Sequence, residues 1–452
     1  LARWNACPTQ VRHVGTSQFI FRLAAAPIRD KTGAPRRMGR RASCIAAPLG
    51  GTRALHMGGS RSVGRKKRIM LVFGTRPEAI KMAPVYRALR ARQDVFDTLC
   101  CVTAQHRQML DQALRSFAIV PDIDLDLMRH DQGLADVKAA AILAMTKVLR
   151  DERPDLLLVH GDTTTSMASA TAAFYAGIPV GHVEAGLRSR DLQAPFPEEF
   201  NRRVTSMIAR YHFAPTELNK ANLIEEGCDP GAIFVTGNTV IDALRYMGER
   251  HDAEVSLRRE VADRLDMALR FDWRTERYVI VTCHRRENFS QGLQRISEAV
   301  RRLAAAFPAV HFVCPAHPNP AVRGPVLQLL DGLANVHVIK PLPYEAFLHL
   351  MRSCHSVVTD SGGLQEEAPA MGKPVLVMRE VTERPEAIAA GGVKLVGSDT
   401  ADIVMGVSAL LTDGQLCRSM ASAPNPYGDG TASEQIADVL ERALSSSVLL
   451  PA

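Results

Sequence analysis

The sequence predicts an α/β protein with two Rossmann-like, doubly wound domains that face each other across a cleft. From Lys67 onward, short β-branched runs alternate with longer helical patterns, which is typical of parallel βαβ units. After a charged helical stretch at about 242–270, the strand and helix pattern restarts. This restart favours a second sheet over one very wide sheet, and 452 residues are enough for two or three domains.

The first run of elements indicates an N-terminal domain over residues 67–238. Its expected strands are 68–74, 97–104, 155–162, 179–185 and 233–238, and its expected helices are 81–92, 106–117, 134–152 and 164–177. Each strand is short and rich in β-branched residues, and helical patterns fill most of the intervals.

The second run indicates a C-terminal, nucleotide-binding domain over residues 239–430. Its expected strands are 277–287, 309–319, 336–343, 356–363 and 374–380. A Pro/Gly-rich segment at 425–430 precedes a last helix at 433–446. We expect the segment 431–446 to pack back on the N-terminal domain.

Charge is divided unevenly along the chain. Residues 1–68 hold fifteen Lys/Arg and one acid, a net charge of +14, whereas the remainder carries −7, so the pI of about 9.0 reflects the first segment. The body shows no basic stripe interleaved with aromatic residues, which argues against nucleic-acid binding. We expect residues 1–66 to be a disordered extension or a mis-assigned start upstream of Met57; a transit peptide is the alternative.

Cysteine usage and hydropathy indicate a soluble, cytoplasmic protein. The nine cysteines form no CxxC pair, which fits a reducing compartment better than a disulfide scaffold or a zinc site. No apolar run approaches the roughly 20 residues of a membrane span.

Polar residues follow several predicted strands, at the sheet edge where ligands bind in open α/β sheets. In FGTRPEAIKMAP, Arg76 offers a fork of donors, Pro77 can open a helix whose first-turn amides are free for an anion, and Lys81 lies one turn further on. The alternative is a capped turn with a surface arginine. In HGDTTT, Asp162 lies two residues after His160, before threonines that could cap a helix.

The segment GHVEAGLRSRDLQAPFPEEFNRR, residues 181–203, concentrates charge at the end of another predicted strand. Glu184 follows that strand directly, and Glu198 and Glu199 begin a helix. The helix dipole favours acids in a first turn, which explains Glu198 or Glu199 but not Glu184. Four arginines of this segment are expected to offset the negative charge of these acids or to hold the loop in place: Arg188, Arg190, Arg202 and Arg203.

In the second domain, His284 and Arg285 end the first strand, where they could act as an acid or as anion ligands. His317 repeats that placement one strand later. Ser361, Gly362 and Gly363 join a strand to a helix, a geometry that suits phosphate, and Glu367 one turn inside could accept hydrogen bonds from a ribose. No GxxxxGK[ST] motif is present, which argues against a P-loop ATPase.

Nine blocks in order carry a family resemblance: FGTRPEAIKMAP, TAQHRQMLDQ, HGDTTT, GHVEAGLRS, PEEFNR, TGNTVIDAL, HRREN, TDSGGLQEEAP and TERPEA. From about Lys67 to beyond residue 430, the chain closely resembles the non-hydrolysing UDP-N-acetylglucosamine 2-epimerases of bacteria. The resemblance implies a GT-B-like fold, a homodimer, no metal or cofactor, and interconversion of UDP-GlcNAc and UDP-ManNAc for surface polysaccharides.

The resemblance also implies roles for individual residues. The catalytic positions are Asp162, Glu184, Glu198 and His284; the substrate-binding positions are Arg76, Lys81, Phe347 near the uracil, Ser361, Gly362, Gly363, Glu367 and Arg384; and positions for allosteric binding of UDP-GlcNAc are Gln105, Gln108, Arg285 and His317. The chain departs from the family pattern at Leu342, where a glutamine is frequent, and at Cys283, where glycine is frequent.

The implied reaction explains why several acids should share one cleft. The C2 hydrogen of the sugar is not acidic, but breaking the C1–O bond to UDP builds positive charge at C1 and acidifies it. Elimination then gives a 2-acetamidoglucal, and re-addition of UDP with protonation on the other face inverts C2. Two faces call for two acid/base groups, and repulsion between carboxylates could raise one pKa toward neutrality.

Other functions remain open on the sequence alone. The chain could act on another UDP-acetamido sugar or hydrolyse the glycal to free ManNAc. It could also be a GT-B glycosyltransferase, although that would not need acids after several strands of the first domain. A catalytically dead nucleotide-sugar sensor is the alternative outside the enzymes; retention of all four catalytic positions argues against it.

Overall fold

The computed structural model describes residues 65–104, 107–129, 132–283, 291–316, 324, 328–330 and 332–445. The chain divides into two units, 1–63 and 64–452, and every described residue lies in the second. Of the predicted extension 1–66, only Arg65 and Lys66 are described.

The first sheet has seven parallel strands in the order β3-β2-β1-β4-β5-β6-β7. They are β1 (Lys67–Phe73), β2 (Phe96–Val102), β3 (Ile123–Asp124), β4 (Leu156–His160), β5 (Val180–Val183), β6 (Tyr211–Ala214) and β7 (Ile233–Val235). Residues 69–73 are buried on both faces of the sheet, as expected for a parallel sheet covered by helices on both sides. The sequence did not predict β3, which has only two residues, or β6, which contains no β-branched residue.

The second sheet has six parallel strands in the order β10-β9-β8-β11-β12-β13. They are β8 (Tyr278–Thr282), β9 (His311–Pro315), β10 (Val336–Ile339), β11 (Ser356–Thr359), β12 (Val375–Val377) and β13 (Val393–Leu395). The three-residue edge strand β13 was not predicted. The prediction of two doubly wound, Rossmann-like sheets is confirmed.

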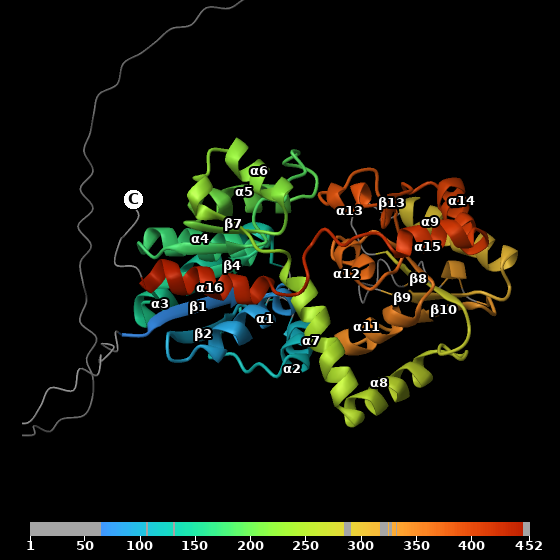
Figure 1. The fold of residues 1–452 in the computed structure, drawn as a ribbon, viewed down its shortest axis with the longest axis horizontal. Helices are drawn as coiled ribbons and strands as arrows, with labels where there is room; N and C mark the ends of the chain where they lie inside the picture. The colour runs from blue at the N-terminus through green and yellow to red at the C-terminus, as the bar shows by residue number, and fades with distance from the viewer. Residues whose placement is uncertain are drawn as a thin grey trace, which may run out of the picture. The chain divides into compact units, whose positions relative to one another are not determined.

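Helices connect the strands in both sheets (Figure 1). Around the first sheet lie α1 (Arg76–Ala91), α2 (Arg107–Ser116), α3 (Leu134–Glu152), α4 (Thr164–Tyr175), α5 (Glu198–Ile208) and α6 (Glu217–Glu225). The later helices are α7 (Thr239–Ala253), α8 (Val255–Ala268), α9 (Gln291–Ala306), α11 (Tyr344–Ser353), α12 (Leu364–Ala370), α13 (Pro385–Ala389), α14 (Thr400–Thr412), α15 (Gly414–Ala421) and α16 (Ala432–Ser445). The charged stretch predicted at 242–270 is therefore two helices, α7 and α8.

Helix α16, the last in the chain, lies beside α1 of the first sheet (Figure 1). Its first backbone amides donate to Asp242 on α7, with Ser433 N at 2.7 Å, and Arg92 at the end of α1 forms an ion pair of 2.6 Å with Asp438. We propose that the domain boundaries follow this arrangement, with 67–238 and 431–446 forming one domain and 239–430 the other.

Strand order reverses between β1 and β4 in the first sheet and between β8 and β11 in the second. In doubly wound sheets, ligands bind at the carboxyl ends of the strands near such a reversal. Arg76, Asp162, Glu184 and Ser361 follow β1, β4, β5 and β11 respectively, so the topology brings these four predicted site residues to the carboxyl edges of the two sheets.

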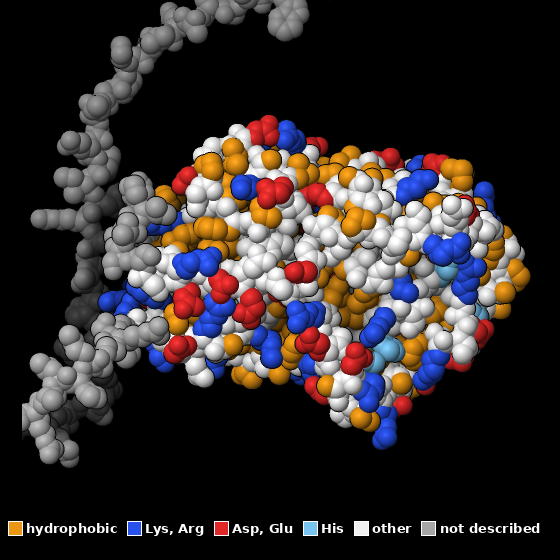
Figure 2. Space-filling view, viewed as in Figure 1, with side chains coloured by type: hydrophobic (Ala, Val, Ile, Leu, Met, Phe, Trp, Pro, Cys, Tyr) orange, Lys and Arg blue, Asp and Glu red, His pale blue; other side chains and the backbone are white. Residues whose placement is uncertain are grey.

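The surface mixes charges of both signs. On the face drawn in Figure 2, Lys and Arg side chains alternate with Asp and Glu, and hydrophobic side chains lie scattered among them. None of the described helices is both long and apolar enough to cross a membrane.

Candidate active site

Glu184 forms the centre of a buried polar cluster at the carboxyl edge of the first sheet. It follows β5 with a φ of +62°, a left-handed conformation that is uncommon for a non-glycine residue and is found disproportionately at functional sites. Its carboxylate pairs with Lys81, accepts a hydrogen bond from Asn238 Nδ2 at 2.9 Å, and lies 3.5 Å from His160 Nε2 and 3.9 Å from Arg384 Nη2. Four separate segments of chain therefore converge on one carboxylate.

These partners keep Glu184 ionised. Burial alone would raise its pKa, but the charge of Lys81, then His160 and Arg384, lowers the pKa well below its ordinary value. Crowding of carboxylates does not raise the pKa of Glu184, because cations surround it more closely than acids do. The site carboxyl with a raised pKa is Glu367: burial is the main cause, the charge of Glu366 adds to it, and the pKa reaches about 7.

Lys81 lies between two carboxylates. It is buried on α1 and contacts Glu184 from its own domain, while its Nζ lies 2.7 Å from Glu366 Oε2 on α12 of the other domain. Glu366 also accepts from Arg384 Nε at 2.5 Å. Sequence reasoning did not single out Glu366; the only signal was its place beside Glu367 in the first turn of a helix that follows a strand.

Two further residues of the cluster were not among the predicted site residues. Asn238 caps α7 through its side chain and also donates to Glu184, and His160 ends β4. Both are polar residues at or just after the end of a strand, which is the same signal that identified Asp162 and Glu184.

Asp162 and Glu198 lie on neighbouring segments. Asp162 pairs with Arg202 on α5, and Asn201 Nδ2 donates to the Asp162 carbonyl at 2.9 Å. Glu198 is the first residue of α5, as predicted, and is half-buried. The structure thus brings the loop after β4 against the start of α5.

Glu199 is a structural residue of the same helix. It is fully buried and accepts from the backbone amide of Ser189 at 3.0 Å and from Arg202 at 3.1 Å. Arg188 forms an ion pair of 2.7 Å with Glu226, and Arg190 pairs with Glu225 at 2.6 Å. These ion pairs join the loop to α6, and the role of the arginines in holding it stays a prediction.

The turn after β1 differs from its prediction. Thr75 and Glu78 form a capping box, in which Glu78 Oε2 accepts from the backbone amides of Gly74 at 3.0 Å and Thr75 at 2.8 Å. These two amides precede the helix; within its first turn, the Glu78 amide donates to Thr75 Oγ1 at 3.4 Å. The expectation of a free first-turn amide is therefore wrong at Glu78, and the alternative of a capped turn is the one observed. Arg76, whose pKa burial lowers, donates to the carbonyl of Leu342 at 3.4 Å.

The predicted phosphate loop lies where β11 leads into α12. Ser361 is half-buried, and a side chain at Gly363 would meet no neighbour within 4 Å, so this backbone is open to close approach. Tyr344 Oη donates to Glu367 at 3.1 Å, and Phe347 lies on the same helix as Tyr344. Ser361, Gly363 and Glu367 therefore share one turn and helix.

Several predicted residues lie outside the described part of the chain: His284, Arg285, Gln105 and His317. Gln108 is described and is exposed on α2. Of the two departures from the family pattern, Leu342 is buried and Cys283 is half-buried, with a pKa that burial raises. Within the described residues, no three His, Cys, Asp or Glu side chains group so that they could hold a metal ion.

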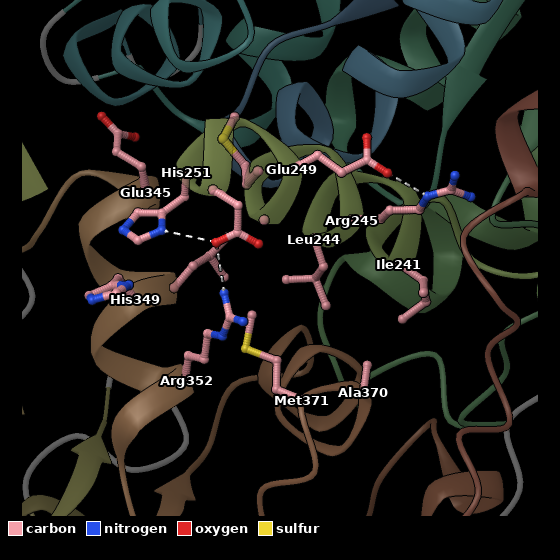
Figure 3. A pocket seen from close by; sticks show the side chains of 14 residues that line it. Ile241, Leu244, Arg245, Glu249, His251, Glu345, His349, Arg352, Ala370 and Met371 are labelled. Atoms are coloured by element: carbon pink, nitrogen blue, oxygen red, sulfur yellow. Dashed lines mark hydrogen bonds and ion pairs between the residues drawn. The ribbon is translucent and has the colours of Figure 1, made fainter. Parts of the chain in front are cut away.

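A separate pocket of about 410 Å³ lies between α7, α11 and α12 (Figure 3). Its lining includes His251, Arg352 and Met371, and none of the predicted site residues. His251 stacks on His349 with ring centroids 4.3 Å apart.

Comparison with known proteins places the chain in a family. The family model of UDP-N-acetylglucosamine 2-epimerase matches residues 87–441. The chain belongs to this family. A curated UDP-N-acetylglucosamine 2-epimerase of Yersinia pestis is 50% identical over 374 residues, which cover 83% of this chain and 98% of that protein. The corresponding enzyme of Escherichia coli K12 is 48% identical over 374 residues, with the same two coverages.

Solved structures of the family share the fold. The crystal structure of UDP-GlcNAc 2-epimerase from Neisseria meningitidis bound to UDP-GlcNAc has a TM-score of 0.79 and 46% identity, covering 83% of this chain and all of that one. The expected GT-B-like arrangement of two Rossmann-like domains is therefore confirmed, as is the family resemblance of the nine sequence blocks.

Proposed function

We propose that this chain is a non-hydrolysing UDP-N-acetylglucosamine 2-epimerase, an isomerase that interconverts UDP-GlcNAc and UDP-ManNAc. The observation that supports this most is the buried Glu184 carboxylate, which Lys81, His160 and Asn238 surround at a strand edge. A positioned, ionised carboxylate is what removal of a sugar proton requires. Family membership and the UDP-GlcNAc in the Neisseria relative support the choice of substrate.

The proposed reaction begins with loss of UDP. The C1–O bond breaks with its electron pair going to the β-phosphate oxygen, and a carboxylate takes the proton from C2, which leaves a 2-acetamidoglucal. UDP then adds back at C1 while an acid delivers a proton to the opposite face of C2. We assign proton transfer to Asp162, Glu184 and Glu198, without dividing the two faces among them.

Cationic groups would bind the departing pyrophosphate. We assign this to Arg76, Lys81, Arg384 and the Ser361–Gly363 turn at the start of α12, where charge developing in the transition state meets preorganised donors. Arg76 donates to a neutral carbonyl, so its charge is not cancelled by that contact. His284, outside the described residues, is proposed as a pyrophosphate contact or leaving-group acid.

The nucleoside would bind along α11 and α12. A ribose diol can donate to Glu367, whose carboxyl is already oriented by Tyr344, and Phe347 on the same helix is proposed to contact the uracil. No metal or cofactor enters the proposed reaction.

In many bacterial members of this family, UDP-GlcNAc binds at a second site as an activator, and we propose the same regulation here through Gln105, Gln108, Arg285 and His317. Gln108, the described member of the set, is exposed on α2 and so is accessible to a ligand. A sigmoidal response to UDP-ManNAc that becomes hyperbolic on adding traces of UDP-GlcNAc is expected, and a hyperbolic response throughout would contradict the proposal.

We also propose a homodimer that works in the cytoplasm in surface polysaccharide synthesis. Helices α3 and α5 both pack on α4, and all three expose large apolar side chains. Met207 is 85% exposed, Leu143 73% and Phe174 62%. Large apolar side chains exposed on adjoining helices are a feature of surfaces that another protein covers, and a second copy is the partner we propose.

Incubation with UDP-GlcNAc tests the activity. The proposal predicts UDP-ManNAc as the product; free ManNAc with UDP would indicate the hydrolysing reaction instead, and UDP-GlcNAc bound without turnover would indicate a sensor. A Glu225→Gln variant, which neutralises an exposed acid paired with Arg190 on the neighbouring loop, is expected to retain activity.

A further inference from the structure

Glu366 is a fully buried carboxylate near the proposed site, and the mechanism above does not use it. It is the third residue of α12, and its side chain has no exposed surface. Two cations reach it: Lys81 Nζ at 2.7 Å and Arg384 Nε at 2.5 Å. A buried carboxylate with no such partners would be strongly unfavourable, so these contacts account for its presence in the interior.

The same two cations also face Glu184. Lys81 contacts the Glu184 carboxylate directly, and Arg384 Nη2 lies 3.9 Å from it. Lys81 comes from α1, whereas Arg384 precedes α13. The remaining groups around Glu184 are His160 at the end of β4 and Asn238 before α7. Glu184 and Glu366 therefore share Lys81 and Arg384, and Arg384 also pairs with Glu383 at 2.5 Å.

We propose that Glu366 is a positioning residue of this site: it holds Arg384, and part of Lys81, away from Glu184, and so leaves Glu184 able to accept a proton from substrate. The proposal rests on the proposed function. Arg384 binds Glu366 2.5 Å away in preference to Glu184 at 3.9 Å. Without Glu366, Lys81 would lose its second carboxylate and could turn fully toward Glu184, while Arg384 would keep its ion pair with Glu383, 2.5 Å from Arg384 Nη1, beside its contact with Glu184. A carboxylate so stabilised is a weaker base.

The position of Glu366 also makes this arrangement depend on both domains. Lys81 and Glu184 belong to the first domain, whereas Glu366 and Arg384 belong to the second. The Lys81–Glu366 pair can form only where α1 and α12 meet, so the distribution of charge around Glu184 is set when the two domains come together.

Glu366→Gln tests the proposal because the amide has nearly the same shape and lacks the charge. We expect kcat to fall about tenfold or more, since proton transfer to a positioned base commonly contributes at least 10²-fold. We expect the Kd for UDP to stay the same or become tighter, because a negative charge is removed beside the cations proposed to bind pyrophosphate. Steady-state kinetics with UDP-GlcNAc measure kcat, and calorimetry with UDP measures the Kd. The stoichiometry from calorimetry shows what fraction of the variant is folded and able to bind UDP.

Glutamine variants of two other acids, Glu386 and Glu367, serve as comparisons for Glu366→Gln. Glu386 on α13 crosses the same domain junction, where it accepts from Thr216 Oγ1 at 2.6 Å. Glu386→Gln is expected to leave kcat within about twofold of the wild type. Glu367→Gln, the adjacent position on α12, is expected to weaken UDP binding, which Glu366→Gln should not.

Glu366→Asp covers the case in which the glutamine variant does not fold, because it keeps the charge and shortens the side chain. The expected order of kcat is wild type, then Glu366→Asp, then Glu366→Gln. An unchanged kcat in Glu366→Gln, a UDP affinity that falls in parallel with kcat, or an aspartate variant slower than the glutamine variant would each overturn the proposal. A wild-type protein that binds UDP but shows no epimerisation would instead overturn the proposed function.

Discussion

At the scale of single residues, burial and neighbouring charges shift the pKa of each carboxyl group in the site in different directions. Glu184 is ionised because Lys81 and its other partners outweigh burial, whereas burial dominates at Glu367. The sequence identified both residues but could not show which of them has the higher pKa. That depends on how close Lys81 and Tyr344 lie to them, and these distances are set only when the chain folds.

Replacing Glu184 is expected to separate chemistry from binding. Glu184→Gln keeps the shape and removes the proposed base, so kcat should fall by about 10² to 10⁴, as for other general acid/base groups. The Kd for UDP should change only a few-fold, because UDP lacks the sugar carbon that Glu184 serves. Kinetics and calorimetry measure both; a variant with wild-type kcat would remove Glu184 from the mechanism.

Because the pKa of Glu367 is raised in the folded chain, we expect the stability of the fold to depend on pH. Its folded pKa of about 7 exceeds its ordinary value, so between about pH 4.5 and 7 the folded chain retains a proton that the unfolded chain has released. Its contribution to stability is therefore lost as pH rises through this window, by on the order of 3 kcal/mol.

Denaturant unfolding of the wild type and of Glu367→Gln, from pH 5 to 8, measures this effect. The glutamine does not titrate, so its stability relative to the wild type should increase with pH and level off above about pH 7. A difference that stays constant across the range would contradict the assigned pKa.

At the scale of elements, the carboxylate of Glu78 links the starts of α1 and α4 through hydrogen bonds. Glu78 accepts from the amides of Gly74 and Thr75 and also from Thr163 Oγ1 at 2.6 Å and Ser166 Oγ at 3.0 Å. The turns that carry Arg76 and Asp162 are therefore fixed relative to each other.

Removing this acid should destabilise the fold measurably. Glu78→Ala leaves the amides of Gly74 and Thr75 without their acceptor and removes one acceptor from the hydroxyls of Thr163 and Ser166, of which Ser166 keeps the His160 carbonyl at 2.5 Å. We therefore expect a loss of about 2–4 kcal/mol in the free energy of unfolding. Glu217→Ala provides the control, because Glu217 is an exposed first-turn acid of α6 and should cost less than about 0.5 kcal/mol. Equal losses from the two variants would show that Glu78 does not tie the turns together.

Elements were predictable where the pattern was strong. The continuous apolar run of β1 was recognisable, as were α3 and α4, which contain no glycine or proline over 19 and 12 residues, and Thr163 caps α4 as expected. The edge strands β3 and β13 were missed because two or three residues show no alternation. The sequence could not choose between an anion site and a capped turn after β1, since PEAIK allows Glu78 to face either solvent or its own turn.

At the scale of the whole molecule, the order of elements indicated two sheets, and the two sheets bring residues far apart in sequence together. Arg384 and Glu184, 200 positions apart, share a cluster that local patterns could not reveal. Glu366 escaped notice for the same reason, because its partner Lys81 lies in the other domain.

The proposed homodimer yields a prediction at this scale. Leu143→Asp combined with Met207→Asp places charges on the exposed apolar face of α3 and α5, so the protein should elute as a monomer in size exclusion with light scattering. Val255 and Met267, exposed on α8, provide a control pair, and their substitution should leave the dimer intact. A wild type that is itself monomeric would contradict the proposal.

The cluster around Glu184 is proposed to transfer a proton at C2 of the sugar. Proton NMR of UDP-GlcNAc with the protein in deuterated water measures this transfer. We predict that deuterium enters C2 as UDP-ManNAc forms, and that both processes are lost together in Glu184→Gln. Formation of UDP-ManNAc that retains its original C2 hydrogen would contradict it.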